Sequence, residues 1–359
     1  MTIKRALEDV PVDAEAEERA WAVVSRAYRD RVAVPRARRR WPVVAIATAA
    51  VVIAAALSPP GRAVVDAVRR SVGVSHASPA LFRLPAAGRL LVSGAGGTWV
   101  VSADGSRRRL GSWREAAWSP HGLFVVGAGG NELAAVEPSS GDVRWSLARR
   151  RVSAPAWGGT RTDTRILYFS RGRLRVVGGD GRGDRSMAPE QAALIAWRPE
   201  RLECAMVSRL GGVSTMGIGK AEIHGAWGVL SKPRAIAWAP DGRSFAVATP
   251  KYVVIYRGGR HRVLDIPGVR ALAYSRDGTL AVARSNGLAV VHGSRARTVF
   301  TSAGRVDGLA WSPDGRWLVT SAPDADQWIF VRGAHVVAVS NIARQFGGGV
   351  SLDGWASGT

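Results

Sequence analysis

Short runs of apolar residues separated by polar, glycine-rich breaks cover most of this chain, and one phrase recurs among them. The phrase places an aromatic residue after two or three apolar ones. Its aromatic position falls at Trp118, Trp157, Trp197, Trp238, Tyr274 and Trp311. The successive differences in position are 39, 40, 41, 36 and 37. A repeat of about 40 residues with strand-like content is typical of the blades of a β-propeller.

The copies at 236–242 and 309–315 are the most complete, and both end in Pro-Asp-Gly. Proline presets φ and glycine tolerates positive φ, so these residues predict a tight turn. We therefore expect Asp241, Asp277 and Asp314 to be structural turn residues, with the aromatic side chain packed between neighbouring units. Further runs rich in β-branched residues follow each turn, as in 252–256 and 287–291. Four short antiparallel strands per repeat are the composition of a propeller blade.

The number of blades follows from the number of units. A weaker unit occupies 81–113, before the six clear copies, and the tail at 346–355 holds one more strand-and-turn pattern. This tail could complete the first blade and close the ring. We predict an all-β, seven-bladed propeller over residues 81–359, with six blades as the alternative.

The recurring phrase resembles the WD40-like repeats of TolB-type β-propellers, whose units carry an apolar-Trp-Ser-Pro-Asp-Gly signature. The resemblance covers roughly 81–355, although the unit at 155–160 lacks both Pro and Asp after its tryptophan. It implies a repeat propeller of a membrane-anchored bacterial type. It implies almost nothing about function, because one fold carries many activities.

Residues 41–57 form an uncharged apolar run whose length is near the lower limit for a membrane-spanning helix. Seven arginines lie just before it, between positions 26 and 40, and three follow it between positions 62 and 70. The positive-inside rule then predicts a single-pass protein of the bacterial cytoplasmic membrane, with its N-terminus inside and the propeller extracytoplasmic. A cleaved signal peptide and a buried soluble helix are the alternatives, but about 40 preceding residues are long for a signal peptide. Residues 58–80 would form a juxtamembrane stalk.

The predicted cytoplasmic segment, 1–40, ends in an arginine-rich flank and contains a candidate amphipathic helix at 14–30. Trp21, Val24 and Tyr28 lie on its apolar face and are candidates for binding a partner. The layout of helix, span and external domain is similar to that of membrane-bound anti-sigma regulators. The chain lacks their zinc-binding His-x-x-x-Cys-x-x-Cys pattern, because Cys204 is its single cysteine.

Charge narrows the range of partners. The formal net charge is +22, and only four of the 50 basic residues are lysines. The arginines are scattered through the repeats rather than clustered with aromatic residues, and an external domain would rarely meet DNA, so we do not expect nucleic-acid binding. Anionic lipid headgroups or an envelope polymer are more plausible ligands of a basic surface. A merely solvated basic surface, reflecting a GC-rich genome, remains an alternative.

No motif identifies a catalytic, cofactor-binding or metal-binding residue. Cys204 lies in an apolar run, which predicts a packed core thiol, and the six histidines show no metal-ligand spacing. The glycine-rich stretch 211–220 lacks the Ser or Thr that follows the lysine of a phosphate loop, and we interpret it as a hairpin. The stretch 135–145 resembles one copy of the tryptophan-docking motif of quinoprotein propellers, but a hairpin with a packed tryptophan explains it.

The sequence thus favours a non-catalytic, membrane-anchored scaffold or sensor that binds a protein or envelope ligand. The first alternative is a trans-membrane regulator that signals through the N-terminal helix. The second alternative is a propeller enzyme, a hydrolase or lyase, which would require acidic residues to converge at the central channel.

Overall fold

The structure of the chain is a computed structural model that describes residues 77–78, 83–187 and 192–358. The predicted cytoplasmic helix at 14–30, the predicted span at 41–57 and most of the predicted stalk lie outside the described residues. Within the described ranges, no helix is both long enough and apolar enough to cross a membrane. Residues from Ala77 onward form one compact unit.

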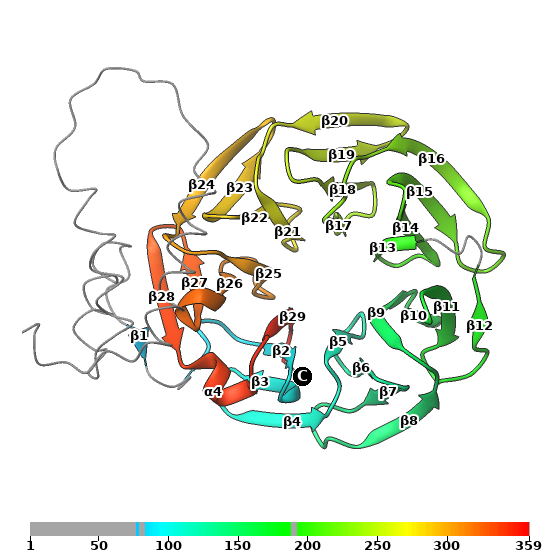
Figure 1. Cartoon of the computed structure of the whole chain (residues 1–359), viewed down its shortest axis with the longest axis horizontal. Helices are drawn as coiled ribbons and strands as arrows, with labels where there is room; N and C mark the ends of the chain where they lie inside the picture. Colours follow the sequence, from blue (N-terminus) through cyan, green and yellow to red (C-terminus); the bar gives the residue numbers. More distant parts are fainter. Residues whose placement is uncertain (1–76, 79–82, 188–191, 359) are drawn as a thin grey trace, which may run out of the picture. The chain divides into compact units, whose positions relative to one another are not determined.

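The described residues form seven sheets arranged in a ring, each with four antiparallel strands, which confirms the predicted seven-bladed propeller (Figure 1). Each sheet contributes its first strand to the centre of the ring and its fourth strand to the outside. The inner strands follow one another around the channel in chain order, and β29 lies between β25 and β5. One predicted repeat unit therefore corresponds to one complete sheet of the ring.

The strands of each blade follow one another from the inner strand outward. Blade 1 comprises β29 (Ser351–Ala356), β2 (Arg89–Gly94), β3 (Gly97–Ser102) and β4 (Arg107–Gly111). Blade 2 comprises β5 (Glu115–Trp118), β6 (Val125–Gly129), β7 (Glu132–Val136) and β8 (Val143–Ala148). Blade 3 comprises β9 (Val152–Gly159), β10 (Thr164–Ser170), β11 (Arg173–Gly178) and the short β12 (Arg185–Ser186). Blade 4 comprises β13 (Ala192–Trp197), β14 (Glu203–Ser208), β15 (Gly212–Gly217) and β16 (Ile223–Val229).

The remaining three blades follow the same order. Blade 5 comprises β17 (Ala235–Trp238), β18 (Ser244–Ala248), β19 (Val253–Arg257) and β20 (Arg260–Leu264). Blade 6 comprises β21 (Val269–Tyr274), β22 (Leu280–Arg284), β23 (Gly287–His292) and β24 (Arg295–Thr301). Blade 7 comprises β25 (Asp307–Trp311), β26 (Leu318–Ala322), β27 (Gln327–Arg332) and β28 (His335–Ser340). Its loops contain a 3₁₀ turn, η2 (Pro323–Ala325), and a short helix, α4 (Ile342–Phe346).

The last strand of the chain closes the ring. β29 pairs antiparallel with β2, with Leu90 opposite Trp355, so the C-terminal tail supplies the inner strand of the first blade. This pairing confirms the predicted role of the tail. A further strand, β1 (Ala77–Ser78), pairs in parallel with β28 at the outer edge of blade 7. Two residues that the sequence analysis assigns to the stalk therefore belong to the propeller sheet.

The signature tryptophans link neighbouring blades. The indole Nε1 of Trp197 donates to the carbonyl oxygen of Ala156 in the preceding inner strand at 2.8 Å. Two further donations of this kind run from Trp118 to Gly354 at 3.3 Å and from Trp311 to Ala273 at 3.1 Å. A Cβ atom on Gly158 would lie 2.1 Å from the Trp197 ring, so only glycine allows this close approach. Three of the six signature aromatic residues therefore contact the inner strand of the preceding blade.

The turn after each signature aromatic is held by side-chain hydrogen bonds. In blade 7, Ser312 donates its hydroxyl to Asp314, which also accepts from the backbone N–H of Arg316 at 3.1 Å. Asp277 accepts from the N–H of Thr279 at 3.1 Å, and Asp241 accepts from the N–H of Arg243 at 2.9 Å. These carboxylates cap backbone donors of a tight turn, as the Pro-Asp-Gly pattern predicts.

The hydrophobic core lies between adjacent blades. One cluster joins Val100 of blade 1 to Val125 and Trp113 of blade 2, and another joins Tyr168 of blade 3 to Val126 of blade 2. A single blade buries neither of its faces without neighbours, so the ring is stabilised by stacking. Cys204 is fully buried in the cluster between blades 3 and 4, which is the packed position that the sequence predicts.

Two signature tryptophans make a matched test of the inter-blade hydrogen bond. The indole N–H of Trp197 has the acceptor described above, whereas that of Trp238 is buried with no acceptor among the described residues. We expect Trp197→Phe to lower the free energy of unfolding by about 1–2 kcal/mol more than Trp238→Phe, because only the first change leaves a carbonyl unpaired. Urea denaturation of both variants measures the difference, and equal losses would contradict this role.

Candidate functional site

The loops of the propeller divide into two sets that lie on opposite faces of the ring. Strand direction alternates within each sheet, so the loop between the second and third strands lies at the same end as the connection to the next blade. The signature turns, between the first and second strands, lie at the other end together with the loops between the third and fourth strands. The connections between blades are short, so the equivalent ends of all seven blades lie on the same face.

Basic side chains are concentrated on the first of these faces, which we call the arginine face. Its loops hold eleven basic residues and three acidic ones within the described ranges. The basic residues are Arg114, Arg149, Arg150, Arg151, Arg171, Arg209, Lys232, Arg234, Lys251, Arg305 and Arg344, and the acidic ones are Asp265, Asp324 and Asp326. All of the basic residues except Arg149 are exposed. The arginine face therefore carries a strong excess of positive charge.

The opposite face has no such excess. Its described loops hold nine basic residues, Arg83, Arg161, Arg182, Arg198, Arg201, Lys220, Arg243, Arg276 and Arg316. They also hold eleven acidic residues, Asp104, Glu137, Asp142, Asp163, Asp180, Asp184, Glu200, Glu222, Asp241, Asp277 and Asp314. Three of these acids are the turn aspartates of the repeat signature, so the turn chemistry itself adds negative charge to this face.

Sequence reasoning found the arginines but interpreted them as scattered, whereas the tertiary structure gathers many of them on one face. The signal was available in their position within the repeat. Arg150, Arg151 and Lys232 all lie a few residues before an inner strand, and the turn aspartates all lie after one. Sorting charges by that position would have separated the two faces.

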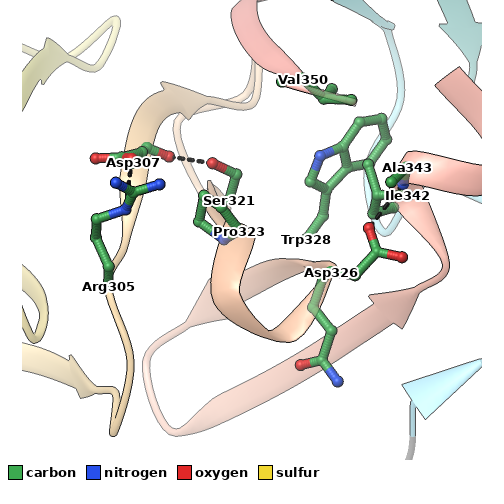
Figure 2. A pocket seen from close by; sticks show the side chains of 11 residues that line it. Arg305, Asp307, Ser321, Pro323, Asp326, Trp328, Ile342, Ala343 and Val350 are labelled. Carbon is green, nitrogen blue, oxygen red and sulfur yellow. Dashed lines mark hydrogen bonds and ion pairs between the residues drawn. The ribbon is translucent and has the colours of Figure 1, made fainter. Parts of the chain in front are cut away.

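A cavity of about 290 Å³ opens at the junction of blades 7 and 1, and we call it the blade-7 cavity (Figure 2). Its walls come from the loop before β25, from η2 and from the segment that leads from α4 to β29. The residues that line it are Arg305, Asp307, Ser321, Pro323, Asp326, Gln327, Trp328, Ile342, Ala343, Gly349 and Val350. These loops belong to the arginine face. Two of the three loop acids of that face, Asp324 and Asp326, lie in the same region as the cavity.

The polar groups of the blade-7 cavity differ in how well they are paired. Arg305 lies 3.0 Å from Asp307, which also receives Arg270 at 3.4 Å. Asp326 accepts from the backbone N–H of Ala343 at 2.7 Å and so caps the start of α4. Trp328 is fully buried, and its indole N–H has no acceptor among the described residues. The cavity thus combines paired charges near its mouth with one unpaired buried donor.

A second candidate group lies on the channel side of blade 1. Asp353 stands at a bulge in the inner strand β29, where the pairing shifts between Leu91 and Val92. Burial, together with the negative charge of Glu115, raises the pKa of Asp353 to about 7 against the opposing effect of the nearby hydroxyls of Ser93 and Ser351. Neither Asp353 Oδ2 nor Ser93 Oγ makes a well-formed hydrogen bond to a described residue. Asp353 does not line the blade-7 cavity.

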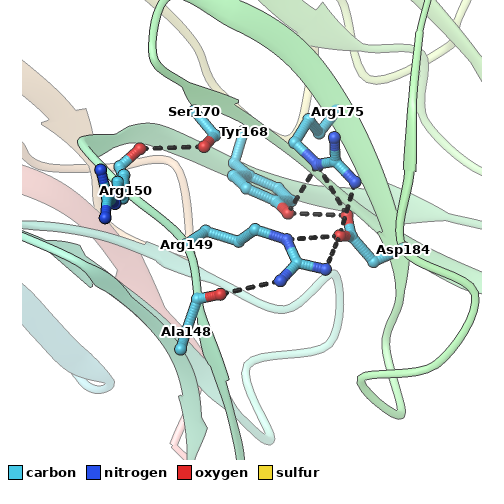
Figure 3. A network of polar contacts seen from close by, with 7 residues as sticks. All are labelled: Ala148, Arg149, Arg150, Tyr168, Ser170, Arg175 and Asp184. Atoms are coloured by element: carbon cyan, nitrogen blue, oxygen red, sulfur yellow. Dashed lines mark hydrogen bonds and ion pairs between the residues drawn. The ribbon is translucent and has the colours of Figure 1, made fainter.

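A buried carboxylate connects blades 2 and 3 through the network shown in Figure 3. Asp184, whose side chain is 6% exposed, accepts from Arg149 Nε at 2.8 Å and from Arg175 Nη2 at 2.7 Å. Tyr168 donates its hydroxyl to the same carboxylate at 2.7 Å. Burial alone would raise the pKa of Asp184, but the hydrogen bonds from Arg175, Tyr168 and Arg149 outweigh it and hold the pKa below its usual value. Asp184 therefore stays ionised and structural.

The remaining sequence candidates do not converge on a reactive centre in the described part of the chain. Burial raises the pKa of Cys204 to about 12, so its thiol stays protonated. Within the described ranges, no group of three or more His, Cys, Asp or Glu residues could hold a metal ion. The stretch at 135–145 forms the hairpin of β7 and β8, and Trp145 donates to the carbonyl of Gly179 at 2.9 Å. Trp21, Val24 and Tyr28 lie outside the described residues, and their role stays a prediction.

Comparison with known proteins supports the fold. Residues 293–331 match the family model "WD domain, G-beta repeat", a segment that begins just before β24 and ends in β27. No curated protein sequence matches the chain. Hydrazine synthase of Kuenenia stuttgartiensis is a similar solved structure, at 15% identity and a TM-score of 0.51, covering 61% of this chain and 76% of that one.

A chain of a mitotic checkpoint complex is also similar, at 20% identity and a TM-score of 0.58, covering 71% of this chain and 90% of that one. At these identities the likeness shows the fold alone. The protein is thus a seven-bladed β-propeller that contains a WD-repeat segment. The TolB-type and bacterial parts of the sequence resemblance stay predictions.

Removal of the Asp353 charge should change the pH dependence of stability. The folded-state pKa lies above the ordinary value of 3.8, so the protonated form favours the folded state and this stabilisation is lost as pH rises from about 4 to 7. Asp353→Asn should therefore raise the free energy of unfolding at pH 8 by up to about 4 kcal/mol and have little effect near pH 4. Thermal unfolding across this range measures it, with the exposed Asp265→Asn as a control that should leave the profile unchanged.

Loss of the Asp184 carboxylate should destabilise the contact between blades 2 and 3. We expect Asp184→Ala to lower the free energy of unfolding by about 2–4 kcal/mol at pH 7, because it leaves two arginines and a buried hydroxyl without their acceptor. Arg144→Ala, which removes the exposed ion pair with Glu137, should cost less than about 1 kcal/mol. Because the pKa of Asp184 is lowered, its contribution should disappear only as pH falls below the ordinary carboxylate range. Chemical denaturation at pH 7 and pH 3 tests both statements.

Proposed function

We propose that this protein is a non-catalytic binding scaffold or sensor whose arginine face binds an acidic protein partner. The single observation that carries the proposal is the charge asymmetry between the two faces, with eleven basic and three acidic loop residues on one and a near balance on the other. Such a field steers an oppositely charged partner toward one side of a molecule and excludes like-charged ones.

The structural context favours recognition over chemistry. The basic residues stand on short loops that a rigid ring of sheets holds in place, which is a common arrangement for binding surfaces. Ten of the eleven are exposed, so their charge is available to a partner rather than used in the core. Two well-paired carboxylates of the described residues, Asp184 and Asp314, hold structure together.

The membrane part of the proposal rests on sequence. The apolar run at 41–57 and its arginine-rich N-terminal flank favour a single-pass anchor in the bacterial cytoplasmic membrane, with the propeller outside. A reporter that is active only outside the cytoplasm, fused after the last residue, should be active in cells. A silent fusion with the protein present at normal levels would reverse this orientation.

Other polyanions are alternatives that a binding experiment separates. Anionic lipid headgroups and anionic envelope polymers would respond to the same positive field, so salt dependence alone does not distinguish them from an acidic protein. Vesicles with and without anionic lipid, and isolated cell-wall material, are therefore compared with protein capture. Binding to either of these without any protein partner would replace the proposed partner.

Neutralising matched arginines on the two faces tests the proposal. The triple variant R150Q/R171Q/R209Q removes three charges from the arginine face, and R243Q/R276Q/R316Q removes three from the opposite face. We expect the first to lower capture of the principal partner from membrane extract by about tenfold, since each exposed charge contributes up to about 1 kcal/mol, and the second to change it less than twofold. Quantitative mass spectrometry of the captured proteins measures both. Equal losses would show that net charge rather than the arginine face matters.

A further inference from the structure

We propose that an acidic segment of a protein partner docks across blades 2, 3 and 4, with its carboxylates on four arginines and an apolar side chain beyond them. The residues that receive it, which we call the docking patch, are Arg150, Arg151, Arg171, Arg209, Leu210 and Val229. The inference rests on the proposed function and deepens it, because it assigns the partner to one part of the arginine face and states the chemistry of the segment that binds.

The loops that carry the arginines are in contact with one another. The backbone N–H of Arg171, in the loop between β10 and β11, donates to the carbonyl oxygen of Arg150 at 3.2 Å. The hydroxyl of Ser170 donates to the same oxygen at 2.9 Å (Figure 3). On the other side of this loop, a Cβ atom on Gly172 would lie 3.0 Å from Nη2 of Arg209, so the guanidinium of Arg209 lies over the backbone next to Arg171. Basic residues of three loops therefore meet at one place on the arginine face.

The charges of the docking patch are not neutralised within the described part of the chain. None of its four arginines has an ion pair with a described acidic residue. Arg149 differs from them, because it lies 2.6 Å from Asp184. Figure 3 shows the guanidinium of Arg150 on the side of its residue away from that carboxylate. Glu132, which begins the adjacent strand β7, accepts from the indole N–H of Trp113 at 3.0 Å. The positive charges thus remain available to an anionic partner.

The backbone fixes the positions of two of these arginines. Arg151 and Arg171 both have a φ of 52°, in the left-handed region that few residues other than glycine adopt. The N–H of Arg151 donates to Oδ1 of Asn131 at 3.3 Å, and the bond from Arg171 to Arg150 holds the second loop. Non-glycine residues held in this conformation by their surroundings occur preferentially at functional sites. The spacing of the charges is therefore set before a partner binds.

Apolar surface adjoins the arginines on blade 4. Leu210 follows Arg209 directly and is 81% exposed, the highest value among the large apolar side chains of the described residues. Val229, at the end of β16, is 75% exposed and is paired with Gly212 just after this loop. Because blades 2, 3 and 4 follow one another around the ring (Figure 1), charge comes first along the patch and apolar surface second. A segment with an acidic half and an apolar half matches that order.

An anionic membrane is the competing occupant, and the composition of the patch argues against it. Protein surfaces that rest in the lipid interface are rich in tryptophan and tyrosine. The exposed large apolar side chains of the described residues include no aromatic one. Fixed arginines beside two aliphatic side chains suit a peptide with defined carboxylate positions better than mobile headgroups.

Synthetic peptides test the assignment on the full chain in nonionic detergent, with fluorescence anisotropy as the measurement. The first peptide has an acidic half of Asp and Glu and an apolar half of Leu. A second has the same composition with acidic and apolar residues alternating, and a third has Ser in place of Leu. We expect half-saturation of the first at about 100 µM at low salt, and binding of the other two at least about threefold weaker.

Matched variants separate the patch from the rest of the face. R171Q/R209Q should weaken binding of the first peptide about tenfold, whereas R234Q/K251Q removes two exposed charges from blade 5 of the same face and should change it less than about twofold. Leu210→Ser should weaken it several-fold without a change of charge, and Leu123→Ser, exposed on the opposite face, should leave it unchanged. Losses as large for R234Q/K251Q as for R171Q/R209Q, or equal binding of the three peptides, would overturn the docking patch.

Hydrogen exchange of the full chain in lipid nanodiscs distinguishes the membrane. With neutral lipid, the first peptide should slow exchange of the amides at 149–151, 171–172 and 209–211. Slower exchange at these amides with anionic lipid alone, and none with the peptide, would assign the patch to lipid instead. If R150Q/R171Q/R209Q still loses capture of the partner while the peptide does not bind, the proposed function stands and the docking patch fails. If the peptide binds at the patch and no acidic protein is captured, the proposed function fails and the patch stands.

Discussion

Closure of the ring by the C-terminal strand is the constraint on which the rest of this structure depends. β29 pairs with β2 and lies between β25 and β5, so the last strand of the chain supplies the inner strand of the first blade. Without it, blade 1 would lack an inner strand and Trp118 would lose the carbonyl of Gly354 as its acceptor. Every blade buries its faces only against its neighbours, and closure gives the first and last blades the same environment as the others.

The same closing segment also builds the groups with the greatest chemical interest. The connection that carries α4 toward β29 forms one wall of the blade-7 cavity, and β29 itself places Asp353 at a bulge on the channel side. A bulge turns one side chain out of register and bends its strand, which accounts for the irregular position of Asp353 in the strand. The segment that closes the ring thus also carries one wall of the blade-7 cavity and Asp353, both at the junction of blades 7 and 1.

The two faces of the ring acquire different charges for a structural reason. The face with the signature turns uses aspartate at 241, 277 and 314 to hold backbone N–H groups, which adds three negative charges to that face. The loops of the arginine face have no such requirement, and they tolerate long basic side chains. A nearly regular repeat therefore produces a molecule with one charged side, although most of the basic residues of that side are not neighbours in the linear sequence.

Local pattern in the sequence determined the sheets, the turns and the blade number. The Trp-x-Pro-Asp-Gly pattern at 238–242 and 311–315, together with its looser copies, indicated inner strands and their turns, because a strand and the turn after it depend on residues close in the chain. The position of the tail indicated ring closure. The gathering of Arg150, Arg171 and Arg209 on one face, the contact of Arg149 with Asp184, and the cavity beside Trp328 were decided only by the tertiary structure. They bring together residues from different blades, whose separation in sequence is unrelated to their distance in space. Short-range periodicity specifies the unit, while the stacking of units around a closed ring specifies which side chains meet.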